Sequence, residues 1–92
     1  MTSSPHEDRR AELLQLVDAA QRVAGVVAAR DRGDRDDAAH LLSTLHDDGM
    51  LGQGALLLTD VLLRLHQERT GESLQTTLQH LSVQLEASLR AA

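Results

Sequence analysis

The residues best suited to chemistry in this sequence are histidines and aspartates gathered between positions 36 and 48. The group consists of His40, His46, Asp36, Asp37, Asp47 and Asp48. Imidazole and carboxylate side chains are common ligands of zinc. The two histidines are six residues apart, however, which places them on roughly opposite sides of a helix, and the His-Glu-x-x-His spacing of zinc enzymes does not occur. We therefore expect a solvated acidic helix end here, with no bound metal and no other cofactor.

A second candidate is the glycine-rich stretch that holds Gly49, Gly52 and Gly54. Glycine-rich loops can cradle phosphates, but the known fingerprints require a preceding strand and a set order of glycines. Neither is present in this stretch. We expect a tight turn between two helices, with a close approach of the backbone.

The stretch Gly71-Glu72-Ser73-Leu74 resembles the Gly-x-Asp-Ser-Leu motif of acyl and peptidyl carrier proteins, which are also small, acidic and four-helical. In that family the serine carries phosphopantetheine, so the resemblance implies Ser73 as an attachment site. Glu72 stands where the family has aspartate. The simpler expectation is that Ser73 caps a helix.

The same region, over residues 60–85, resembles a helix-turn-helix, with Thr70-Gly71-Glu72-Ser73 as the turn. The resemblance implies a DNA-associated transcriptional regulator whose reading helix would present Thr76, Thr77 and His80. That helix has one basic residue, Arg90, whereas phosphate contacts supply most nonspecific affinity for DNA. This function is the alternative to the one preferred below, and we expect no nucleic-acid partner.

Catalytic groups do not form a recognisable arrangement. The chain has no cysteine, and neither a Ser/His/Asp pattern nor a carboxylate pair can be identified. The acid–base residues lie where solvated helix faces are expected. We predict that the protein is not an enzyme.

Length and composition indicate one small helical domain covering residues 1–92. A chain of this size has a small margin of stability. The absence of cysteine excludes disulfides and thiolate zinc sites as reinforcement. Oligomerisation or partner binding is therefore the expected source of additional stability.

Charge and residue usage suggest where the protein works. All nine basic residues are arginine, and the formal net charge is −5. Such usage is typical of a GC-rich genome, and a negative chain repels nucleic acid at long range. The first ten residues lack the apolar segment of a signal peptide, and the longest apolar run, 55–58, cannot span a bilayer. We expect a cytoplasmic protein of a high-GC bacterium with no membrane contact.

The predicted fold class is all-α, a small bundle of four helices of which one is short. Ser4 and Asp34 are suitable N-caps, either Ser73 or Thr70 can cap the fourth helix, and Gly33 suits the left-handed position after a helix. The predicted helices cover residues 5–31, 35–47, 50–69 and 73–90, with 1–4 flexible. Strand signals are absent, because alternation is missing and β-branched residues are few.

The predicted core is aliphatic and consists of Leu, Val and Ala. In the first helix the expected buried stripe, with helical period, is Leu13, Leu16, Val17, Ala20, Val23, Ala24 and Val27. In the short helix it is Ala38, Leu41, Leu42 and Leu45. The third helix is apolar on two sides and is expected to be central, touched by several neighbours.

Apolar residues in excess of this core point to a contact surface. Leu56 and Leu63 lie off the main stripe of the third helix. A narrow leucine seam runs along the fourth, with members Leu74, Leu78, Leu81, Leu85 and Leu89. The predicted partner or dimer interface is Leu56, Leu63, Leu74, Leu78, Leu81 and Leu85. The predicted function is a non-enzymatic interaction or regulatory module that acts through apolar helix faces as a homodimer, which completes the core.

Overall fold

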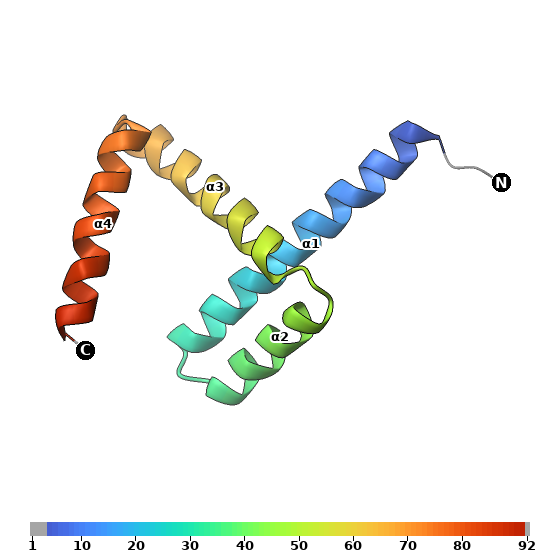
Figure 1. Ribbon diagram of the computed structural model, residues 1–92, viewed down its shortest axis with the longest axis horizontal. Coiled ribbons are helices and arrows are strands. Elements are labelled where there is room, and N and C mark those ends of the chain that lie inside the picture. The colour runs from blue at the N-terminus through green and yellow to red at the C-terminus, as the bar shows by residue number, and fades with distance from the viewer. Residues whose placement is uncertain (1–3, 92) are drawn as a thin grey trace. The chain divides into compact units, whose positions relative to one another are not determined.

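The computed structural model describes residues 4–91 and contains four helices in that range. They are α1 (Pro5–Asp31), α2 (Arg35–Asp47), α3 (Leu51–Thr70) and α4 (Leu74–Ala91) (Figure 1). No strand occurs among the described residues, so the all-α prediction is confirmed. Within the same range, every helix is too short or too polar to cross a membrane. The predicted flexible start falls on residues outside the described range, apart from Ser4.

The N-caps predicted at Ser4 and Asp34 are confirmed, and of the two candidates for the fourth helix Ser73 is the cap. Side-chain oxygens of Ser4, Asp34 and Ser73 each accept the backbone N–H of the residue three positions later, at 3.2, 3.0 and 3.2 Å. Each bond satisfies one of the N–H groups that a helix start leaves without an intrahelical partner. These local contacts determine where α1, α2 and α4 begin.

The turn after α1 shows how local chemistry ends one helix and starts the next. Gly33 has a φ of 78°, in the left-handed region that residues with a Cβ avoid. The neighbouring Asp34 then caps α2. The predictions made for both residues are confirmed.

Removal of the Asp34 cap should destabilise the fold measurably. We expect Asp34→Ala to lower the free energy of unfolding by about 1 kcal/mol, because the first turn of α2 loses a hydrogen-bond acceptor. Asp34→Asn keeps an acceptor and should lose far less. Urea unfolding followed by far-UV circular dichroism checks both variants, and equal losses would contradict a capping role.

The contacts within the chain divide it into two units, with the boundary between Thr59 and Asp60 inside α3. The first unit holds α1, α2 and the first turns of α3. The second holds the rest of α3 and α4. That residues 1–92 form one domain stays a prediction.

The core of the first unit lies between α1 and α2, which run side by side (Figure 1). Leu45 of α2 is fully buried and is the largest such side chain. Around it the buried residues are small: Ala19, Val26, Ala29 and Ala38, with Val23, Leu41, Met50 and Leu51 packed against them. The predicted Leu/Val/Ala composition therefore describes this core.

The predicted buried stripe of α1 is confirmed only in part. Ala20 is buried and Val23 packs against the core, but Leu13, Val17 and Val27 are exposed, and Ala19 and Val26 are buried instead. Because α1 is apolar on more than one side, periodicity alone does not determine which face is buried. The buried face is the one that carries small residues, which let neighbouring helices approach closely. Leu42, expected in the stripe of α2, is likewise exposed.

The close approach occurs where α3 crosses α1. Gly54 is buried, and a Cβ built on it would lie 2.8 Å from the carbonyl carbon of Ala19. This confirms the predicted close backbone approach in the glycine-rich stretch. Gly49 makes the turn before α3 with a φ of 70°. Gly52 has no other atom within 4 Å of a built Cβ.

The second unit is a helical hairpin with very little core. Thr77 is the only buried residue described between 60 and 91. The only residue of α3 that is buried is Gly54, which belongs to the first unit. The prediction that the third helix is the central, most enclosed one is therefore wrong. Beyond Gly54 its residues, the leucines included, are partly or fully exposed.

Candidate interaction surface

The leucine seam of α4 is the largest exposed apolar feature of the second unit. Leu74, Leu78 and Leu81 are between 43% and 45% exposed, and exposure rises to 67% at Leu85 and 79% at Leu89. Helical spacing of three and four residues places all five along one side of α4. We call these five residues the α4 seam. A seam that becomes more exposed toward the helix end is suited to contact with another molecule.

Of the other two predicted interface residues, only Leu63 lies in the same unit as the α4 seam. Leu56 is 64% exposed, but it lies in the first unit. Leu63 lies in the second unit and is only partly exposed. The candidate surface is therefore the α4 seam, with the exposed apolar residues of its own hairpin: Val61, Leu62 and Leu65.

Charge is sparse along the α4 seam. Between Leu74 and Ala91 the acidic and basic residues are Glu86 and Arg90, which pair with each other at 3.7 Å. Positions 60–92 hold four acidic and three basic residues, a net charge of −1, whereas positions 1–59 hold ten and six, a net charge of −4. The second unit is therefore the nearly neutral part of an acidic chain.

A polar cluster around Glu72 joins the two helices of the hairpin. The Thr77 hydroxyl donates to Glu72 Oε1 at 2.8 Å. His80 Nδ1 and His66 Nε2 lie 3.4 and 3.7 Å from the same oxygen. The hydrogen bond from Thr77 is the main reason that the pKa of Glu72 lies below its usual value. It outweighs the opposing effect of partial burial, and the two histidines add to it.

Glu72 should make the stability of the hairpin depend on pH. Because folding lowers the pKa of Glu72, its contribution is complete above the unfolded value of about 4.3 and is lost as the pH falls through the folded value. We expect the urea midpoint to fall between pH 5 and pH 3, with a smaller fall in Glu72→Gln. Identical pH dependence in both proteins would contradict this role.

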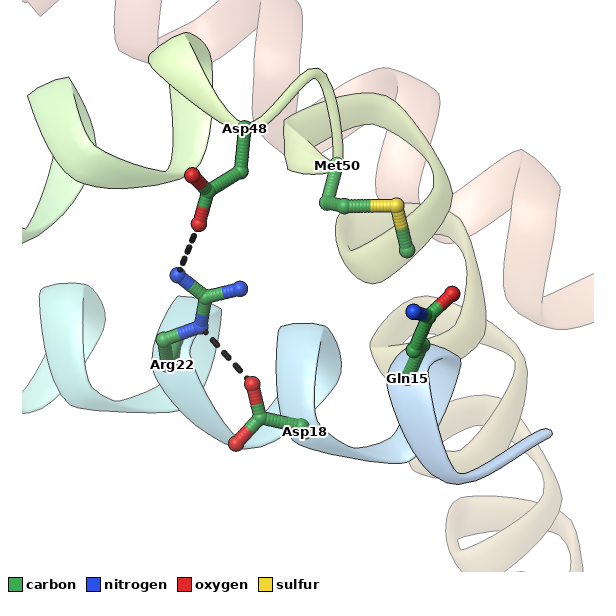
Figure 2. Close-up of a pocket in the computed structure, with 5 residues that line it drawn as sticks. All are labelled: Gln15, Asp18, Arg22, Asp48 and Met50. Atoms are coloured by element: carbon green, nitrogen blue, oxygen red, sulfur yellow. Dashed lines mark hydrogen bonds and ion pairs between the residues drawn. The ribbon is translucent and has the colours of Figure 1, made fainter. Parts of the chain in front are cut away.

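Arg22 is the centre of a polar cluster in the first unit. Figure 2 shows its guanidinium between two carboxylates: Nη1 donates to Asp48 Oδ2 at 2.8 Å, and Nε lies 3.1 Å from Asp18 Oδ2. The N–H of Nε is not aligned with Asp18, so that contact is an ion pair rather than a hydrogen bond. The hydrogen bond with Asp48 is the largest cause of the raised pKa of Arg22.

The Arg22 cluster connects helices and is a poor binding site. It borders a cavity of about 430 Å³, which Gln15 and Met50 also line. The single guanidinium is already engaged by both carboxylates and the cluster keeps a net charge of −1, so no free cation is available for an anionic ligand. Asp18 and Arg22 lie at the acid-first i,i+4 spacing that favours such a pair within one helix. The sequence has no signal for Asp48, which comes from the end of a different helix.

The remaining candidates from the sequence are the two histidines of α2 and Ser73. His40 and His46 are exposed, and among residues 4–91 no three His, Asp or Glu side chains are grouped as metal ligands would be. Ser73 Oγ, besides accepting the N–H of Thr76, donates to the Thr76 hydroxyl at 2.9 Å. The cap therefore accounts for both hydrogen bonds of Ser73.

Comparison with protein-family models, curated proteins and solved structures finds no match for this chain. Its function is therefore inferred from its residues and their geometry.

Proposed function

We propose that this protein is a small, non-enzymatic interaction module that pairs with a second copy of itself through the α4 seam. The observation that carries the proposal is the unpartnered seam, whose five leucines are 43–79% exposed. Between residues 60 and 91 no apolar side chain is buried, and helices without a packed apolar face are marginal in water. A regulatory role in a bacterial cytoplasm is the setting that residue usage suggests.

The exposed apolar side chains of the second unit supply much of the area that a dimer requires. Eight large side chains, those of the α4 seam with Val61, Leu62 and Leu65, are on average about half exposed. At roughly 60–120 Å² for a fully exposed aliphatic side chain, they offer roughly 250–500 Å². A standard interface buries about 800 Å² per partner, of which about 60% is apolar, or about 480 Å². The eight side chains therefore supply between half and all of that apolar area.

The charge distribution favours a second copy as the partner. In a two-fold dimer the same patch is used twice, so a net charge on the patch opposes an equal net charge on its partner. Chains with a net charge of −5 repel each other unless they meet through a neutral region. The α4 seam lies in the unit with a net charge of −1, and its one ion pair is internal.

The proposal predicts a dimer that polar substitutions in the α4 seam dissociate. We expect sedimentation velocity of the full chain to show a dimer. Leu78→Gln together with Leu81→Gln should raise the dissociation constant roughly 100- to 1000-fold, because four half-buried leucines are lost per dimer. The matched control is Val83→Gln. Val83 is 59% exposed, but its position two residues from Leu81 places it on the opposite side of α4.

Three outcomes would overturn this proposal. One is a strict monomer at high protein concentration. Another is an equal effect of the seam and Val83 variants. The third is a different activity: salt-dependent binding of duplex DNA would favour the regulator alternative, and a phosphopantetheine mass on Ser73 would favour the carrier alternative.

A further inference from the structure

We propose that a pocket between α1 and α2 binds a helical segment of a partner protein that presents a leucine beside a single carboxylate. All residues that line the pocket belong to the first unit, so it shares no residue with the α4 seam. Its lining consists of Val26, Arg30, Arg35, Ala38, Ala39 and Leu42. An apolar floor with two cations beside it defines the chemistry of the partner.

The floor of the pocket suits an aliphatic side chain. Val26 and Ala38 are buried, while Ala39 and Leu42 are exposed at the opening. The cavity has a volume of about 460 Å³ and is open to solvent. Because the small residues leave room between the helices, a leucine can enter without displacing a core side chain. An open depression of this kind accepts one side of a helix better than it encloses a free small molecule.

The two arginines of the pocket have charges that the described chain does not neutralise. No carboxylate of residues 4–91 lies within 4.0 Å of Arg30 or Arg35. By contrast, Arg22 and Arg32 each pair with an aspartate at 2.8 and 3.1 Å. In a unit with ten acidic residues, two arginines without a partner at one pocket favour a carboxylate as the ligand group.

The location of Arg35 also opposes the electrostatics of its own helix. It is the first residue of α2, at the positive end of the helix dipole, where cations are destabilising. Asp36 and Asp37 in the same turn follow the favourable pattern. A residue that weakens its helix and lines an apolar pocket is better explained by contact with a partner than by folding.

The partner needs one carboxylate rather than many. Asp31, Asp34 and Asp36 flank the two arginines in the sequence, so a strongly acidic partner would be repelled. A helix with a single glutamate next to its leucines satisfies both conditions. A probe peptide should therefore carry one glutamate and no other acidic residue.

The test uses the full chain and three capped helical peptides made of Ala, Gln and Leu. One carries a single Glu beside its leucines, and the other two carry Gln or Lys at that position. Each bears one terminal tryptophan. The protein has no aromatic residue, so all tryptophan emission comes from the peptide. We expect the Glu peptide to bind about tenfold more tightly than the Gln peptide, and the Lys peptide to bind most weakly.

Substitutions identify the pocket. Arg30→Gln and Arg35→Gln should each weaken binding of the Glu peptide about five- to tenfold and leave the Gln peptide nearly unchanged, so that a double-mutant cycle isolates the Arg–Glu contact. Arg35→Gln should also raise the thermal midpoint slightly, which shows that the variant is folded. The matched control, Arg9→Gln with Arg10→Gln, removes two charges elsewhere on α1 and should leave binding intact.

The outcomes separate this inference from α4 pairing. Binding that persists when Leu78 and Leu81 are replaced by Gln assigns the peptide to the pocket, and its loss in those variants assigns it to the α4 seam and overturns the inference. Equal binding of the Glu and Gln peptides, or an equal loss with both in the arginine variants, also overturns it. Sodium decanoate is an aliphatic carboxylate that cannot form a helix. If it binds the pocket in place of the peptide, the inference that the partner is helical is wrong.

Discussion

Leu45→Ala is expected to lower the free energy of unfolding by about 2–5 kcal/mol, the range found for large-to-small changes at fully buried aliphatic sites. Leu45 has no exposed surface, and the residues around it are mostly alanine and valine. Such neighbours have short side chains and cannot move into the space that leucine leaves. Domains are stable by only about 5–15 kcal/mol, so this loss would remove a large part of the total.

Leu42→Ala is the matched control for that experiment. Leu42 lies on the same helix and is 41% exposed, so its removal leaves no enclosed cavity and should be much less destabilising. Urea unfolding followed by far-UV circular dichroism measures both variants. If the two substitutions destabilise the protein equally, the core is not centred on Leu45.

Alanine at Gly54 and at Gly52 should change stability in opposite directions. Both glycines lie in α3, where alanine is intrinsically better by up to about 1 kcal/mol. At Gly52 nothing opposes this gain, because no other atom lies within 4 Å of the new Cβ. Gly52→Ala should therefore stabilise the protein by about 0.5–1 kcal/mol.

At Gly54 the same methyl group would be 2.8 Å from the carbonyl carbon, 2.9 Å from the oxygen and 3.0 Å from the Cβ of Ala19. Two of these atoms are backbone atoms, which can yield only if α1 and α3 move apart. Overpacking of this kind costs about 1–3 kcal/mol, which exceeds the gain in helix propensity. Gly54→Ala should destabilise the first unit, and Gly54→Val should do so more strongly.

Thermal unfolding of Gly52→Ala, Gly54→Ala and the unmodified chain gives the comparison. We expect the midpoint to rise in the first variant and fall in the second. A rise in both would show that α3 does not cross α1 at this glycine. The result also concerns the pocket between α1 and α2, because Ala19 belongs to the same core cluster as Val26 and Ala38, which line that pocket.

The helices themselves were predictable because their signals are local. A cap such as Asp34 acts on an N–H three residues away, and Gly33 acts through its own backbone angle. The missing strand pattern and the acid-first i,i+4 spacing of Asp18 and Arg22 likewise depend only on residues a few positions apart in the sequence. Such interactions need no knowledge of distant residues, so four helices follow from the sequence alone.

The choice of buried face was decided by tertiary structure. Periodicity in α1 favoured the side of Leu13, Val17 and Val27, yet the fold buries Ala19 and Val26. The reason is that backbone proximity at Gly54 requires a small residue opposite it, and this requirement appears only when two helices meet. A hydrophobic stripe records how apolar a face is, and it contains no information on how closely another helix approaches.

The candidate sites divide in the same way. The leucines of the α4 seam are visible in the sequence as a helical repeat, and the structure adds that they are exposed. The α1–α2 pocket has no signal in the sequence, because Arg30 and Arg35 come from different helices and only the turn between them brings both to one apolar floor. Local interactions thus determined the four helices of this protein, and contacts between distant residues determined which of their faces are available to a partner.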